Sequence, residues 1–546
     1  MDRFESEIIR SSLTFCSEEM GIALRNSAYS SNIKDRMDHS CAVLDPDGRL
    51  LAQAEHIPVH LGSLPWGLKR TLEYTEREGI ELMKGDMLMV NNPYLSGTHL
   101  NDITLICPIV NGGRTVAYSC NKAHHSDVGG KVPGSIPSDA TDIFQEGIIL
   151  DPVKLVRKGA VDRDVLSMLS SNSRDPYQRK GDVRAQVAAN LLGEKRIISL
   201  IRQYGLKSFV NAAGAALDYS ERMVRKAIAS FPDKTGNAAD CMEMPSGDVG
   251  MKVAVRKKED SISIDYTGTA GQVKAPVNAV YGVTLSAVYY VLKCITDPDI
   301  MMNDGCFRPV AVHVPEGTLL NPTFPYPVSA GNTETSQRNA DLLFRAFYGI
   351  VPERISASCG GSMNNIMIGG LAGGRTWSFY ETNAVGMGAS SGKDGIDGIH
   401  CNMTNTLNTP AELVELYYPL SITRYQFRDG SGGMGEWRGG AGIERSFRIG
   451  NDQTLLTVMA ERERHAPQGL NGGLEGARTE IQLERGGRRE RIPSKCTVEL
   501  SEGDIVTIFT AGGGGFGNPS KREKAAAEAD RRSGLSRTDS SQENAQ

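Results

Sequence analysis

The sequence feature that most constrains the fold is a predicted β-hairpin, in which apolar residues 103–110 and 115–120 flank Asn111-Gly112-Gly113. Asn-Gly supplies the positive φ angles that a tight hairpin turn needs. The strands of a hairpin run antiparallel, so the loop before the first strand and the loop after the second lie at the same end. These loops contain Gly97-Thr98-His99-Leu100-Asn101-Asp102 and His124-His125-Ser126-Asp127. We therefore expect three of the nine histidines to lie near two aspartates.

Side chains of this kind suit a metal ion. His99, Asp102 and His124 provide two imidazoles and a carboxylate, a set that fits Zn, Mn or Fe and leaves positions open for water or substrate. Asp38 precedes a predicted strand near the N-terminus and could complete the set. The alternative is that these are loop residues that cap turns, because the spacing H-x-x-D is common by chance.

Four further residues could border the same pocket. His125 and Asp127 are candidate catalytic residues, either as a general base or as partners that orient a ligand histidine. A structural alternative is that Asp127 caps the turn at Val128-Gly129-Gly130. For His56 and His60, which flank a proline-containing loop, the structural interpretation is favoured over a ligand role.

The chain is long enough for several domains, and the alternation of patterns predicts a mixed α+β, multi-domain fold. We expect a β-rich N-terminal α/β region with the metal site (1–160), a helical region (161–235) and a mixed α/β region with Gly/Asn-rich loops (236–415). A β-rich C-terminal domain (416–519) follows. The polar tail (520–546) is expected to be a frayed helix followed by disorder.

Composition excludes some functions. The net charge of -5, without a basic run beside aromatic residues, argues against a nucleic-acid partner. No apolar run approaches the ~20 residues that cross a bilayer, and the charged N-terminus is not of signal-peptide type, so we expect a cytoplasmic protein without membrane contact. The ten cysteines form no C-x-x-C pair, which favours reduced thiols.

Nucleotide motifs are missing from the sequence. The run Gly512 to Gly515 lacks the Gly-Lys-Ser/Thr ending of a phosphate loop and is better explained by glycines that pack against another backbone. Asp265-Tyr266-Thr267-Gly268 and Gly331-Asn332-Thr333-Glu334 are loop motifs that could line the cavity, although tight-turn duty is favoured for both.

Short motifs along the chain together resemble the B subunit of the hydantoinase B/oxoprolinase family. The resemblance extends to about Pro519. It rests on the following motifs: Asn32-Ile33-Lys34-Asp35-Arg36-Met37-Asp38, Ser40-Cys41-Ala42, His60-Leu61-Gly62-Ser63, Asn92-Pro93-Tyr94, Gly97-Thr98-His99-Leu100-Asn101-Asp102, His124-His125-Ser126-Asp127-Val128-Gly129-Gly130, Gln145-Glu146-Gly147, Asp182-Val183-Arg184-Ala185-Gln186 and Asp265-Tyr266-Thr267-Gly268, with the terminal Gly-rich segment.

The resemblance implies a division of labour between two subunits of a hetero-oligomer. A hydantoinase A-type subunit of actin-like kinase fold would bind ATP and Mg and phosphorylate the carbonyl oxygen of a small cyclic amide. The B subunit would hold a divalent metal where the activated intermediate is attacked. His99, Asp102 and His124 match the family's metal ligands, and Asp38 is a further candidate.

Three hypotheses about function are open once the resemblance is considered. The first is ATP-dependent ring opening of a hydantoin, 5-oxoproline or another lactam, which the compact length of the chain favours. The second is a subunit of an acetone or acetophenone carboxylase, in which the same site receives an enol phosphate. The third is a scaffold without catalysis that has lost its metal, and the intact metal-type residues count against it.

Overall fold

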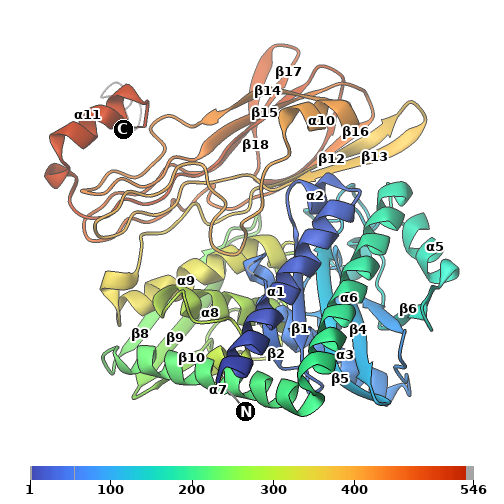
Figure 1. The fold of residues 1–546 in the computed structure, drawn as a ribbon. Coiled ribbons are helices and arrows are strands. Elements are labelled where there is room, and N and C mark those ends of the chain that lie inside the picture. The colour runs from blue at the N-terminus through green and yellow to red at the C-terminus, as the bar shows by residue number, and fades with distance from the viewer. Residues whose placement is uncertain (1–2, 55, 536–546) are drawn as a thin grey trace.

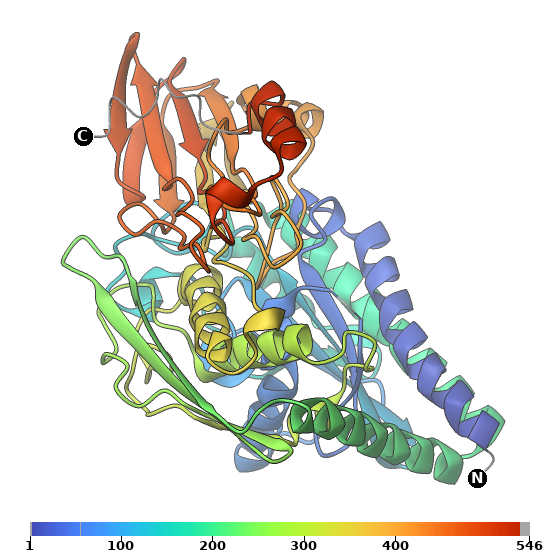
Figure 2. The same ribbon diagram turned by 90° about the vertical axis from the view of Figure 1, so that its left-hand side faces the viewer.

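A computed structural model describes residues 3–54 and 56–535. The protein is mixed α+β, as the sequence predicts, with several sheets and a lower body of helices and strands beneath an upper, β-rich part (Figure 1). In the view turned by 90°, the upper part stands over one side of the body, away from the chain's N-terminal end (Figure 2).

A seven-stranded antiparallel sheet forms the centre of the N-terminal region, in the order β2-β1-β5-β4-β3-β6-β7. Its strands are β1 (His39–Leu44), β2 (Leu50–Gln53), β3 (Met87–Val90), β4 (Asp102–Asn111), β5 (Arg114–His124), β6 (Val153–Arg157) and β7 (Ala160–Val161). β4 and β5 are the predicted hairpin, and their register pairs Asp102 with His124. The expectation that the two histidine loops meet at one end of the hairpin is confirmed.

Helices cover this sheet. The first helix is α1 (Arg3–Ser27), whose buried face carries Ile9, Leu13 and Met20. α1 packs beside α6 (Pro176–Tyr204), and α6 contacts β4 and β5 (Figure 1). The remaining helices of the body are α2 (Ser31–Lys34), α3 (Ser63–Arg77), α4 (Pro93–Ser96), α5 (Arg163–Ser171) and α7 (Leu206–Ala229).

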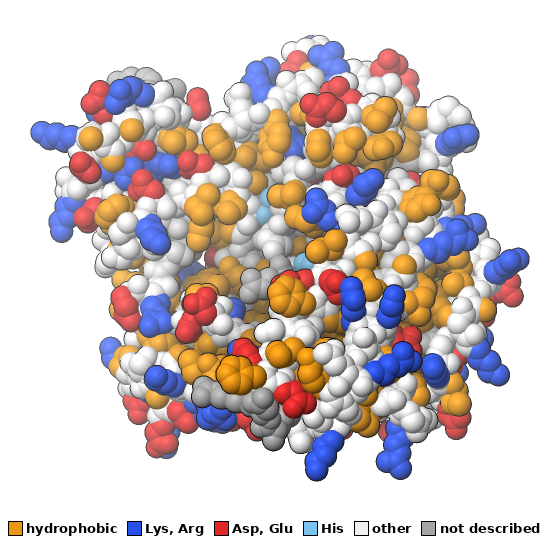
Figure 3. Space-filling view, viewed as in Figure 1, with side chains coloured by type: hydrophobic (Ala, Val, Ile, Leu, Met, Phe, Trp, Pro, Cys, Tyr) orange, Lys and Arg blue, Asp and Glu red, His pale blue; other side chains and the backbone are white. Residues whose placement is uncertain are grey.

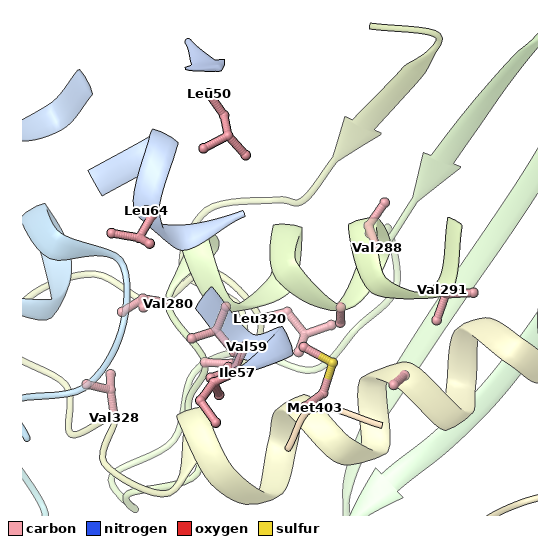
Figure 4. Close-up of a cluster of buried hydrophobic side chains, with 14 of the residues drawn as sticks. Leu50, Ile57, Val59, Leu64, Val280, Val288, Val291, Leu320, Val328 and Met403 are labelled. Carbon is pink, nitrogen blue, oxygen red and sulfur yellow. The ribbon is translucent and has the colours of Figure 1, made fainter. Parts of the chain in front are cut away.

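The middle of the chain adds a four-stranded sheet and two helices. The sheet has the order β11-β10-β9-β8, with β8 (Thr235–Met242), β9 (Val249–Lys258), β10 (Ser261–Asp265) and β11 (Val310–His313). The helices are α8 (Tyr281–Ile295) and α9 (Ser336–Tyr348). Ile57 and Val59 lie in the loop between His56 and His60. They pack with residues of α8 and with Val328 in one apolar cluster (Figure 4). This cluster holds three distant segments of the chain together.

Two sheets form the upper part. One has the order β13-β12-β16-β19 and the other β14-β15-β20-β17-β18. Their elements are β12 (Asn365–Ala372), β13 (Arg375–Glu381), α10 (Ala411–Tyr417), β14 (Leu420–Phe427), β15 (Ile443–Ile449), β16 (Thr454–Met459), β17 (Glu480–Arg485), β18 (Arg488–Ile492), β19 (Lys495–Leu500) and β20 (Ile505–Phe509). Because β12 pairs with β16, this sheet extends across the boundary predicted at 415/416.

The Gly512 to Gly515 run is the centre of a bundle of extended segments. The four N–H groups donate to the carbonyl groups of Ala477, Gly440, Ser358 and Leu474, which lie in three separate segments of the chain. The bundle is visible as extended segments without arrows, running side by side below α11 (Lys524–Arg532) (Figure 1). The glycines therefore pack against other backbones, which is the interpretation that the sequence favours over a phosphate loop.

The helix expected at the start of the polar tail is α11. Asp530 pairs with Arg438 and Arg522, and Arg522 also pairs with Asp394. These ion pairs attach the helix to the upper part, and residues 536–546 lie outside the described part of the chain. Among the described helices, none is long and apolar enough to cross a membrane.

Candidate metal centre

Local hydrogen bonds fold the loop that carries His99 and Asp102. Asn92 caps α4 by accepting a hydrogen bond from the Tyr94 N–H, and α4 ends at Gly97, whose φ of 85° favours glycine. The Asn91 amide donates to Leu100 O, at 2.8 Å. Polar residues of the motif therefore hold the loop in place, and β4 begins at Asp102.

Three ligand-type atoms converge at the end of the hairpin. His99 Nε2 lies 3.0 Å from Asp102 Oδ1 and 3.0 Å from His124 Nδ1. His124 Nδ1 is 3.1 Å from the same Asp102 oxygen. All three side chains are buried, with exposed fractions of at most 2%. The structure thus brings together the three residues that the sequence singles out as ligands.

The tautomer of His99 leaves a lone pair in the centre of this group. Its Nδ1 donates to Ser329 O at 2.9 Å, so Nε2 is the free acceptor that faces Asp102 and His124. Lone pairs so close to one another repel unless a proton or a cation lies between them. The donor set, two imidazole nitrogens and a carboxylate oxygen, is one that divalent transition metals prefer, so the residues fit a metal.

Electrostatics at the group are those of a buried ion pair. Burial would raise the pKa of Asp102, but His99 and the hydrogen bonds from His124 and His60 hold it well below its ordinary value. Burial acts to lower the pKa of His99, but the Asp102 charge and the hydrogen bonds to Asp102 and Ser329 together outweigh it, so the net shift is upward. For His124, burial dominates and the pKa is lowered. A positive charge at the centre of this group is therefore favoured.

Neighbouring side chains fix the orientation of the ligand groups. His60 Nε2 lies 3.2 Å from Asp102 Oδ2, and its Nδ1 lies 2.9 Å from Ser40 Oγ. The amide of Asn332 is 3.4 Å from the same carboxylate oxygen. These contacts engage Oδ2 and leave Oδ1 facing the two histidines.

The upper part of the molecule contributes to the centre through Tyr380 on β13. Its ring stacks on His124 at a centroid distance of 4.6 Å. The Tyr380 hydroxyl donates to Asn365 at 2.9 Å, which fixes the ring from β12. His124 Nε2 is buried and has no hydrogen-bond partner in the described structure. Histidine atoms are visible in the crevice between the two parts (Figure 3).

His125 and Asp127 are not in the group. His125 Nε2 bonds Gln186 of α6 at 2.9 Å. Asp127 accepts hydrogen bonds from the N–H groups of Gly129, Gly134 and Arg174 and also pairs with the Arg174 guanidinium, at 3.0 Å. Asp127 therefore caps its turn, which is the alternative interpretation of the sequence. A catalytic role for the two residues stays a prediction that these contacts do not support.

Asp38 is buried near the group but is not among the atoms that converge. The side chains whose ligand atoms all lie within 4.8 Å of one another are His99, Asp102 and His124. The Asp38 carbonyl accepts a hydrogen bond from the His124 N–H at 3.0 Å, and its carboxylate charge acts on His99 and His124. Its role as a fourth ligand stays a prediction.

The sequence does not predict the contacts that His60, Asn332 and Tyr380 make with the group of His99, Asp102 and His124. It assigns His60 and Asn332 structural duty, yet both contact Asp102. Their proximity to turn residues is the only local signal that the sequence offers. Tyr380 lies in an ordinary strand pattern and gives no sequence signal for contact with His124.

A second group of metal-type side chains lies on the surface. Cys241, Asp248 and His465 have ligand atoms within 4.8 Å of one another, but Asp248 already pairs with Arg464 and with His465. All ten cysteines are free thiols, as expected for a chain without disulfides.

Comparison with other proteins agrees with the sequence motifs. Residues 2–519 match the profile of the hydantoinase B/oxoprolinase family. An uncharacterized protein of Methanocaldococcus jannaschii is 46% identical over 96% of this chain and 92% of its own length. A Pseudomonas sp. protein named as the B subunit of a D-/L-hydantoinase is 31% identical over 96% of this chain and 91% of its own length.

The 5-oxoprolinase 1 of Arabidopsis thaliana is 35% identical over 92% of this chain, which spans only 40% of that protein. Among solved structures, the ATP-dependent caprolactamase of Pseudomonas jessenii superposes with a TM-score of 0.90 and 27% identity, over 98% of this chain and 94% of that chain. A nucleotide-free acetone carboxylase shares the fold, with a TM-score of 0.90 at 19% identity over 98% of this chain and 78% of that chain. The chain belongs to the hydantoinase B/oxoprolinase family.

Proposed function

We propose that this chain is the metal-containing subunit of an ATP-dependent cyclic amide hydrolase. It would open a hydantoin, 5-oxoproline or another lactam after an ATP-binding partner subunit has phosphorylated the substrate. The observation that carries the proposal is the buried convergence of His99 Nε2, Asp102 Oδ1 and His124 Nδ1 within 3.1 Å of one another.

Each part of the site has a task in this reaction. A divalent cation bound there supplies a Lewis acid and lowers the pKa of a coordinated water. Ser329 O keeps His99 in the tautomer that can bind it, and His60 holds Asp102. Burial of the group keeps bulk water away, which protects a reactive phosphorylated amide from unproductive hydrolysis.

Observations on the sequence and on its relatives support the proposed partner subunit. The sequence has no Walker A loop or strand-led G-x-G-x-x-G motif. In the plant 5-oxoprolinase, this chain corresponds to 40% of the protein, so the rest of that polypeptide offers room for an ATP-binding part. The hydantoinase relative is by name one subunit of a larger enzyme.

A carboxylase subunit is the second candidate. The acetone carboxylase has the same fold, but at 19% identity the likeness concerns the fold alone. The caprolactamase match is 27% identical and covers more of the solved chain, which favours an amide substrate.

The decisive assay combines the purified chain with its ATP-binding partner and measures ATP hydrolysis and ring opening. The panel contains hydantoins, 5-oxoproline, larger lactams and ketones, each with and without bicarbonate. We expect ATP-dependent ring opening of a cyclic amide without bicarbonate. Turnover of a ketone that depends on bicarbonate would instead establish the carboxylase.

A further inference from the structure

The motif Gln145-Glu146-Gly147 has no place in the metal group itself, yet its glutamate is fully buried. The Glu146 carboxylate accepts hydrogen bonds from backbone N–H groups of one loop. Oε1 lies 2.9 Å from Val328 N and 2.8 Å from Ser329 N, and Oε2 lies 3.1 Å from Val328 N. A buried carboxylate is costly unless it is well paired, so these bonds fix the position of the loop.

The loop that Glu146 holds is the one that orients His99. Ser329, whose N–H donates to Glu146, uses its own carbonyl to accept the hydrogen bond from His99 Nδ1, at 2.9 Å. The side chain of Val328 is packed in the apolar cluster beneath (Figure 4). The loop is thus fixed by apolar packing on one residue and by the carboxylate at both N–H groups.

The backbone of Glu146 is attached to the segment that follows the other ligand histidine. Lys131 N donates to Gln145 O at 2.9 Å, and Ile148 N donates to Val128 O at 3.0 Å. A Cβ atom at Gly130 would lie 2.8 Å from Glu146 O, so only glycine permits this approach. A continuous set of contacts therefore runs from the segment after His124, through Glu146, to Ser329 and His99.

We propose that Glu146 is a positioning residue of the metal centre, which acts through Ser329 to hold His99 in its ligand tautomer and orientation. Its carboxylate binds the Val328 and Ser329 N–H groups and not the metal group itself. Partners that fix the ring orientation of a ligand histidine typically contribute 10- to 100-fold to metal affinity. This inference rests on the proposed metal centre.

The test measures binding of Co²⁺ to the full-length, metal-free protein, by its visible absorption and by competition with a chelator. Glu146→Ala should weaken binding about 10- to 100-fold. Glu146→Asp withdraws the carboxylate by one methylene and should weaken binding as well. Glu146→Gln keeps an acceptor that can reach both N–H groups and should stay within about threefold of wild type. If Glu146→Ala fails to fold, the aspartate and glutamine variants still decide the question.

Glu243 provides a matched control. It is also buried, and its carboxylate accepts the N–H groups of Arg464 and His465, at 2.9 and 3.0 Å. These two residues belong to the loop that follows β16, not to the loop that orients His99. Glu243→Ala should lower thermal stability, as Glu146→Ala should, and leave unchanged the Co²⁺ affinity and absorption of the centre that His99→Ala removes.

Three results separate the two proposals. The proposed metal centre is wrong if the wild-type protein gives no Co²⁺ spectrum, or if the His99→Ala variant gives the same Co²⁺ spectrum as wild type. If wild type binds Co²⁺ at this centre and Glu146→Ala or Glu146→Asp binds it equally well, the role of Glu146 is wrong. Equal losses of affinity in the Glu146→Ala and Glu243→Ala variants would show a general effect of destabilisation and would also overturn it.

Discussion

At the scale of single residues, the proposed metal centre depends on which atoms of Asp102 and its histidines remain free. His60 and Asn332 engage Asp102 Oδ2, so Oδ1 is left to face His99 and His124. The second nitrogen of His99 binds Ser329 O, and the ring of His124 stacks on the ring of Tyr380. The centre is therefore preorganised by residues that would not bind the cation.

Substitution of His60 tests this preorganisation. His60→Phe keeps an aromatic ring but removes the contact with Asp102, so we expect metal affinity to fall by about 10- to 100-fold. Chelator competition with Zn²⁺ measures the change. His400→Phe is the control, because His400 contacts Asn408 and Thr406 rather than the metal group. Equal affinities of His60→Phe and wild type would show that His60 has only a structural role.

His39 makes the stability of the protein depend on pH. Burial, with repulsion from His56 and His60, lowers its pKa from 6.5 to about 3. The unfolded chain therefore binds a proton below pH 6.5 that the folded chain rejects, and the folded state loses stability as pH falls. The loss is about 1.4 kcal/mol for each pH unit below 6.5.

Urea unfolding of metal-free wild type and His39→Gln between about pH 7 and about pH 5.5 measures this effect. As pH falls, the free energy of unfolding of wild type should decrease relative to that of His39→Gln. His313 is exposed, so the free energy of unfolding of His313→Gln should depend on pH in the same way as that of wild type. A difference between wild type and His39→Gln that is constant with pH would contradict the assignment.

At the scale of elements, the β4–β5 hairpin and the glycine bundle show what local sequence can and cannot predict. The hairpin and the meeting of its two loops follow from Asn111-Gly112-Gly113 and from the antiparallel pairing, both of which are local. The segments that hydrogen-bond to the Gly512 to Gly515 run lie around Ser358, Ala389, Gly440 and Leu474. No local sequence pattern predicts which segments these are.

The glycine bundle predicts a sharp response to one methyl group. A Cβ atom at Gly513 would lie 2.0 Å from Met387 O, so Gly513→Ala should destabilise the protein by about 1–3 kcal/mol. At Gly250, in strand β9, an added Cβ meets nothing within 4 Å, and Gly250→Ala should change stability by at most about 0.5 kcal/mol. Chemical denaturation of both variants gives the comparison. Similar stabilities for the two would show that the bundle tolerates side chains.

At the scale of the whole molecule, the centre lies where separate parts of the fold meet. Asp102 and His124 come from the N-terminal sheet and His99 from the loop before β4. Asn332 and Ser329 come from the middle of the chain, and Tyr380 comes from the upper part. Arg36 strengthens the junction, because its buried guanidinium donates to Leu407 O, Tyr380 O and Thr382 Oγ1. The orientation of the ligands therefore depends on the assembly of the whole chain.

Contacts between these parts explain why the candidate site is only partly predictable. The convergence of His99, Asp102 and His124 can be predicted because one hairpin and its flanking loops carry all three residues. The contacts of Glu146 with Val328 and Ser329 join residues 182 and 183 positions apart, and packing of the complete fold creates them. The pairing of β12 with β16, which lie on opposite sides of the boundary predicted at 415/416, also arises only in the complete fold.

The central claim is that His99, Asp102 and His124 bind a catalytic cation. The most direct measurement is the metal content of purified wild type and of His124→Ala, together with their ring-opening activity beside the ATP-binding partner. We expect about one equivalent of Zn, Mn or Fe in wild type. His124→Ala should contain almost none, still assemble with the partner and open no ring. A metal-free wild type that opens the ring with its partner, or a His124→Ala variant that retains both metal and turnover, would contradict the account.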